Sequence, residues 1–117
     1  MSKLTRVAPE IPVKDLTESV AYYGAKLGFK LEMLMPGGDY AVVERDGVAL
    51  HLFHEAPAIH SPLAFHIFAT GLDELFEELQ KRGADVKQEI LTKPWGTRDF
   101  RIVDPTGNEI KFSEPLS

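Results

Sequence analysis

Histidine is the residue of this sequence best suited to chemistry, because its imidazole can bind a metal or exchange a proton near neutral pH. The chain has four histidines: His51, His54, His60 and His66. It has no cysteine, which excludes thiolate ligands, cysteine nucleophiles and disulfides. His51 and His66 lie in two predicted strands, and we expect both to face the same side of the sheet. His54 has the opposite parity to His51, and His60 lies in a proline-rich linker. Two imidazoles with Glu10 or Glu109 would be one way to assemble a metal site.

Two amphipathic helices must position these residues. The first is predicted to begin near Asp15, with Glu18 in the capping-box position. The second is predicted to begin near Gly71, with Glu74 three residues later. Apolar residues recur at helical spacing in both segments. Each helix is expected to end at a glycine, Gly28 or Gly83.

Strand-like segments flank both helices. They cover 4–13, 29–35, 40–45 and 48–53 around the first helix, and 63–69, 86–90, 98–103 and 109–112 around the second. Each half therefore follows the order βαβββ. We predict the α+β class, with two βαβββ modules forming one curved mixed sheet with a cleft and the helices on its outer face. Residues 1–117 should form a single domain, with module one at about 4–54, a linker at 55–62 and module two at about 63–114.

Composition narrows the possible partners. The 117 residues are 44% hydrophobic and carry a formal net charge of −5, so a nucleic-acid partner is not expected. No apolar run approaches the length of a membrane span, and the N-terminus has no signal-peptide pattern. We therefore predict a cytoplasmic protein with no membrane partner.

Four short motifs, in the right order, resemble those of the glyoxalase/bleomycin resistance (vicinal oxygen chelate) superfamily. They are VKDL at 13–16, YYGAKLGF at 22–29, GLDEL at 71–75 and DPTGN at 104–108. The Ala8-Pro9 pair and PWGTRDF at 94–100 resemble the bleomycin-resistance subgroup. The resemblance spans about 4–114. It implies a homodimer with clefts between the subunits and an exchanged N-terminal arm hinged near Pro9. Pro9 could instead simply mark a strand edge.

The resemblance also indicates where enzymes of this superfamily hold a metal. The four positions are occupied here by Ala8, His51, Ala64 and Lys111. Alanine has no donor atom and the lysine cation repels a divalent ion, so only His51 could act as a ligand. We therefore predict no metal, no other cofactor and no catalytic residue. A glyoxalase- or dioxygenase-type enzyme with an atypical site is the alternative, and a small-molecule sensor is a third possibility.

The predicted cleft offers aromatic and charged surface instead of a metal. We expect a ligand to contact His51, Phe53, His66, Phe68, Trp95, Glu109, Lys111 and Ser113. Flat rings stack on heteroaromatic groups, and a carboxylate such as Glu109 would attract a cation. Phe53 and Phe68 could equally be core residues, and Trp95 could serve only to pin its loop. With the resemblance, this surface predicts a protein that sequesters a bleomycin-like antibiotic or a similar aromatic, cationic ligand.

Overall fold

The structure is a computed structural model that describes residues 1–56 and 61–115. His60 and half of the predicted linker, residues 57–60, therefore lie outside the described residues. The elements are β1 (Glu10–Val13), α1 (Leu16–Leu27), β2 (Lys30–Leu34), β3 (Tyr40–Arg45), β4 (Val48–His54), β5 (Ala64–Phe68), α2 (Leu72–Arg82), β6 (Val86–Thr92), β7 (Thr97–Val103) and β8 (Glu109–Pro115). This order is βαβββ twice, which confirms the α+β class and the two modules.

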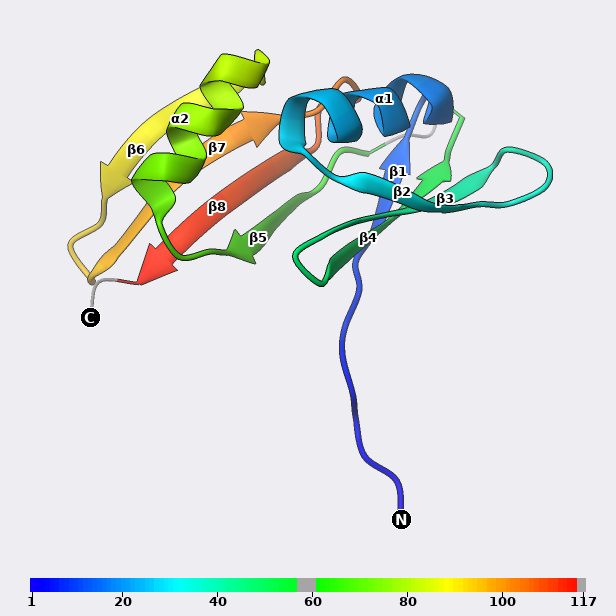
Figure 1. The fold of residues 1–117 in the computed structure, drawn as a ribbon, viewed down its shortest axis with the longest axis horizontal. Coiled ribbons are helices and arrows are strands. Elements are labelled where there is room, and N and C mark those ends of the chain that lie inside the picture. The colour runs from blue at the N-terminus through cyan, green and yellow to red at the C-terminus, as the bar shows by residue number, and fades with distance from the viewer. Residues whose placement is uncertain (57–60, 116–117) are drawn as a thin grey trace.

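The two modules have the same strand pairing. Module one has the strand order β1-β4-β3-β2, and module two has β5-β8-β7-β6. In each, the first and last strands pair in parallel and the others pair antiparallel. Among the described residues the hydrogen-bonded ladders run within modules, so the sheet is divided into two four-stranded halves. Figure 1 shows the halves side by side, with both helices on the same side of them. Neither helix in the described part of the chain has the length and apolar character that a membrane span requires.

The first strand is much shorter than the predicted 4–13. Its backbone ladder begins at Glu10, which is opposite His51 in β4. Pro9 still accepts a hydrogen bond from the His51 amide (3.1 Å), but a proline has no N–H to continue the ladder. The preceding residues leave the body of the protein as an extended arm (Figure 1). Leu4 and Val7 on this arm are 100% and 93% exposed.

The two helices are capped in different ways. In α1 the predicted cap is confirmed, because the Asp15 carboxylate accepts a hydrogen bond from the Glu18 amide (2.9 Å). Gly71 has no side chain to cap α2, and its φ of 64° is in the left-handed region that glycine favours. The carboxylate of Glu114, at the end of β8, accepts from the amides of Gly71 (2.9 Å) and Leu72 (3.4 Å). A residue more than forty positions away in the sequence thus caps α2.

A buried carboxylate, that of Asp104, joins the two modules. It accepts hydrogen bonds from the Tyr23 hydroxyl and from the Thr106 and Asn108 amides, each at 2.9 Å. The Asn108 side chain donates both to Asp104 (2.9 Å) and to the carbonyl of Pro12 in β1 (2.8 Å). The turn before β8 is therefore attached to both α1 and β1 of module one. Burial raises the pKa of Tyr23 well above its ordinary value, and Asp104 raises it further.

Replacing Tyr23 with phenylalanine should destabilise the protein. Tyr23→Phe keeps the ring but removes one of the donors to a buried carboxylate, which costs about 1–3 kcal/mol. Urea unfolding at neutral pH measures the change in the free energy of unfolding. Tyr40→Phe is the matched control, because the hydroxyl of Tyr40 is at the surface and its loss should change stability by less than about 0.5 kcal/mol. Equal stability of the two variants would contradict a stabilising role for this hydrogen bond.

Stability should also fall in alkali. Burial raises the pKa of Tyr22 as well as that of Tyr23. An unfolded tyrosine ionises near pH ~10, whereas these folded tyrosines keep their protons to higher pH. The unfolded state therefore binds fewer protons above that pH, and the free energy of unfolding decreases as the pH rises. Urea midpoints at pH 8 and above pH 10 test this expectation. The decrease should be smaller in Tyr23→Phe, and an unchanged midpoint in the native chain would disprove the linkage.

Candidate functional site

The candidate site is the open face of the two sheets, on the side opposite the helices. In β8, Ile110 (0% exposed) and Phe112 (3% exposed) point into the core. Strand alternation therefore places Glu109, Lys111 and Ser113 on the open face, as the sequence predicted. In β5, Ile67 is buried, so the same alternation places His66 and Phe68 on the open face.

The strand registers arrange this face of module two in cross-strand rows. One row contains His66, Lys111, Arg101 and Gln88, on β5, β8, β7 and β6 respectively. The next row contains Phe68, Ser113, Asp99 and Leu91. We call the first of these the donor row, because each of its four side chains can donate hydrogen bonds. The sequence predicted His66 and Lys111 in it but not Arg101 or Gln88.

His66 is held in place by two of its neighbours. Its Nδ1 atom is hydrogen-bonded to Ser113 Oγ at 2.8 Å. Its ring stacks on that of Phe68, with centroids 5.6 Å apart and planes at 10°. Ser113 is only 3% exposed, so it orients His66 instead of offering a contact surface. Phe68 is 68% exposed, which excludes the alternative that it belongs to the core.

Glu109 is already paired with cations of its own chain. Its carboxylate lies 2.6 Å from Lys87 Nζ and 3.4 Å from an Arg101 guanidinium nitrogen. The hydrogen bond from Lys87 lowers the pKa of Glu109 from its ordinary value. Glu109 is thus an anion balanced by two cations, and its attraction for a cationic ligand is reduced accordingly.

A hydrogen-bonded network on the open face of module one contains Glu10, Tyr40 and His51. The Tyr40 hydroxyl donates to Glu10 Oε2 (2.8 Å) and lies 2.7 Å from His51 Nδ1. The bond to Glu10 raises the pKa of Tyr40, because a tyrosinate could not donate it. Phe53 is opposite Tyr40 in the register and is partly exposed. Tyr40 was not among the residues predicted for the site, although the buried Ala41 and Val43 in β3 give the parity that places it on the open face.

Trp95 lies in the turn between β6 and β7. Hydrogen bonds from Lys93 N to the Thr97 carbonyl (2.7 Å) and from Gly96 N to the Lys93 carbonyl (3.1 Å) close this turn. The Trp95 side chain is 74% exposed, so it does not pack beneath its own loop. It is a large ring free to contact a ligand or a second copy of the chain.

The positions indicated for a metal do not form a donor set. Ala8 lies in the arm, Ala64 is exposed at the start of β5, and the ammonium of Lys111 is a cation. Within 1–56 and 61–115, no three His, Asp or Glu side chains form a group able to hold a metal ion. The residues present therefore do not fit a metal at these positions.

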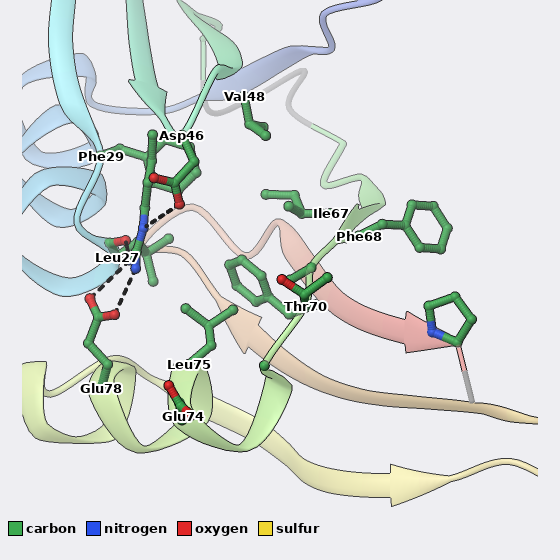
Figure 2. A pocket seen from close by; sticks show the side chains of 15 residues that line it. Leu27, Phe29, Asp46, Val48, Ile67, Phe68, Thr70, Glu74, Leu75 and Glu78 are labelled. Carbon is green, nitrogen blue, oxygen red and sulfur yellow. Dashed lines mark hydrogen bonds and ion pairs between the residues drawn. The ribbon is translucent and has the colours of Figure 1, made fainter. Parts of the chain in front are cut away.

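A hollow of about 840 Å³ lies between the modules. Figure 2 shows apolar side chains of both modules around it, including Leu27, Val48, Ile67 and Leu75. On one side it is bounded by the ion pair between Arg45 of β3 and Glu78 of α2, which approach to 2.7 Å. Phe68 lines the hollow as well as lying on the open face. The sequence did not predict this hollow, because its walls come from segments whose packing depends on how the modules meet.

The fold defines a class of proteins built from paired βαβββ modules, each with its helix on one side of a four-stranded sheet. The family model described as Glyoxalase/Bleomycin resistance protein/Dioxygenase superfamily matches residues 3–112, and the chain belongs to this superfamily. It is 27% identical over 127 residues to a bleomycin resistance protein of Geobacillus stearothermophilus, covering 92% of this chain and 95% of the relative.

Solved structures have the same fold. TioX from Micromonospora sp. ML1 superposes with a TM-score of 0.83 at 21% identity, covering 96% of this chain and 99% of TioX. A lactoylglutathione lyase from Agrobacterium tumefaciens superposes with a TM-score of 0.76 at 18% identity, covering 97% and 96% of the two chains. At these identities the likeness shows the fold alone.

The chain of hydrogen bonds on module one predicts the tautomer of His51. The single hydroxyl proton of Tyr40 is donated to Glu10, so the bond with His51 requires Nδ1 to carry a proton. When His51 is neutral, Nε2 is then the acceptor. Long-range ¹⁵N–¹H NMR above pH 8 should show His51 protonated at Nδ1, and Tyr40→Phe should abolish this preference. His54, which is exposed, is the internal control. A His51 signal that is identical in both proteins would refute the assignment.

Proposed function

We propose that this protein sequesters a bleomycin-like antibiotic, or a similar aromatic and cationic ligand, without a metal. The observation that carries the proposal is the pair of exposed rings, Phe68 and Trp95, on a family fold whose four metal positions hold two alanines, a lysine and one histidine. Exposed aromatic surface binds planar ligands by stacking. The similarity to a bleomycin resistance protein supports the same ligand class.

In this proposal the cation of the ligand lies against module one. Glu109 is balanced by Lys87 and Arg101. Glu10 instead accepts a hydrogen bond from a neutral hydroxyl, that of Tyr40, and no cation pairs with it among the described residues. A ligand ammonium near Glu10 would supply the missing positive charge.

We further propose that a second copy completes the cleft, in a cytoplasmic homodimer with exchanged N-terminal arms. The arm leaves the body of the chain with Leu4 and Val7 almost fully exposed (Figure 1). Burying such a side chain against a partner stabilises the complex by about 1.5–3 kcal/mol. The hollow between the modules is an apolar surface within one chain that a second copy could cover.

The protein should bind bleomycin in a fluorescence titration. The sequence has one tryptophan, so a change in emission on adding metal-free or copper-loaded bleomycin originates at Trp95. The change should saturate with a Kd in the micromolar range or below. Sedimentation at the same chain concentration should show a dimer.

A chain lacking residues 1–7 is the control for the arm. It should sediment as a monomer and bind bleomycin more weakly, as measured by calorimetry. Bleomycin binding by a monomer with unchanged affinity would rule out the shared cleft. A flat fluorescence response together with no heat of binding in the native chain would rule out bleomycin as a ligand.

A further inference from the structure

The donor row on module two is a stretch of four adjacent hydrogen-bond donors. It contains the imidazole of His66, the ammonium of Lys111, the guanidinium of Arg101 and the amide of Gln88. Neighbouring strands are about 4.8 Å apart, so the row crosses about 14 Å of the face. Lys111 and Arg101 are directly opposite each other in the β7–β8 ladder.

The hydrogen-bond acceptors near the donor row are too few to pair with every donor in it. Lys87 and Arg101 share Glu109, while Gln88 and Lys93 share Asp99. These contacts leave Lys111 with no anion or hydrogen-bond partner among the described residues. The Nε atom of Arg101 is buried, and it too has no hydrogen-bond partner within 1–56 and 61–115. Lys111 is therefore the donor of this row that a ligand acceptor can approach without displacing a hydrogen bond or ion pair within the chain.

The internal repeat shows that the fold does not require these cations. The module-one row with the same pairing contains Glu10, His51 and Val42, on β1, β4 and β3. The strand pairing is the same, but this row has one carboxylate, one imidazole and one apolar side chain. The charge of the donor row is therefore specific to module two and is not a structural need of the sheet.

A flat apolar surface lies beside the donor row. Phe68 is exposed, stacks on His66 and follows it by two positions in β5. From strand spacing and rise, Phe68 and Lys111 are separated by about 8 Å diagonally across the face. This separation is comparable to the length of a fused two-ring acid, from its far ring to its carboxylate.

We propose that the donor row binds the carboxylate of a planar aromatic acid, between Lys111 and Arg101, with the ligand ring stacked on Phe68. Guanidinium and carboxylate groups match in geometry, and charge-assisted hydrogen bonds are about twice as strong as neutral ones. This inference rests on the proposed function, since it uses the same open face, and it adds an anionic group to the ligand chemistry. It makes module two the anion-binding half of the cleft.

The test compares two probes that share a ring and differ in charge. Calorimetry of the full chain with 2-naphthoate and with 2-naphthylmethylammonium should show tighter binding of the carboxylate. Lys111→Gln removes the charge without breaking a side-chain hydrogen bond or ion pair among the described residues, and it should weaken naphthoate binding about tenfold. Lys81→Gln, an exposed lysine on α2 away from the open face, is the matched control and should leave the affinity unchanged. Amide shifts on adding naphthoate should concentrate at His66, Phe68 and Lys111.

Several outcomes would overturn the inference. They are equal affinity for the two probes, an unchanged naphthoate affinity in a folded Lys111→Gln variant, or amide shifts located away from β5, β7 and β8. Urea unfolding of each variant checks that the fold is retained. The bleomycin titration separates this inference from the proposed function. Bleomycin binding without naphthoate binding removes the donor-row assignment alone, whereas naphthoate binding that depends on Lys111, without bleomycin binding, removes the bleomycin-like ligand alone.

Discussion

The Asp104 carboxylate connects the two halves of this protein at a point where water is excluded. Moving a carboxylate out of water is costly unless hydrogen bonds replace its hydration. Here a tyrosine from α1, two backbone amides and an asparagine side chain supply those bonds. Asn108 extends the same network to the backbone of β1. This buried network is one of the contacts that fix the relative position of the modules, and so of their open faces.

On the side of the helices, the modules meet through a second set of polar contacts. Arg45 donates to the Leu27 carbonyl at the end of α1 and pairs with Glu78 of α2. This pair is partly exposed, and its free-energy contribution is modest compared with that of a fully satisfied buried network. The hollow between the modules lies beside it (Figure 2). The interface between the modules is thus buried at Asp104, whereas the hollow near Arg45 leaves space for a further side chain or ligand.

Because both helices cover the same side of the sheets, the opposite side is free for binding. Membership of a superfamily that includes both enzymes and resistance proteins does not say which chemistry that face performs. The side chains at equivalent positions decide it. Module one presents Glu10 and His51 where module two presents His66 and Lys111. The two faces therefore differ in charge although their backbones repeat, which suits a ligand with unlike groups at its ends.

The repeat, the helix bounds and the parity of the strands could all be predicted from the sequence. These features depend on local spacing: Asp15 caps a helix three residues away, and Ile110 and Phe112 fix the orientation of Lys111. Which charged groups pair with each other could be seen only in the folded chain. Glu109 pairs with Lys87, and Glu114 caps α2. The Tyr40 hydroxyl forms hydrogen bonds with both Glu10 and His51, so that this network spans three strands. These contacts depend on strand order and register, which bring together residues that are far apart in the chain. No short sequence pattern predicts such contacts.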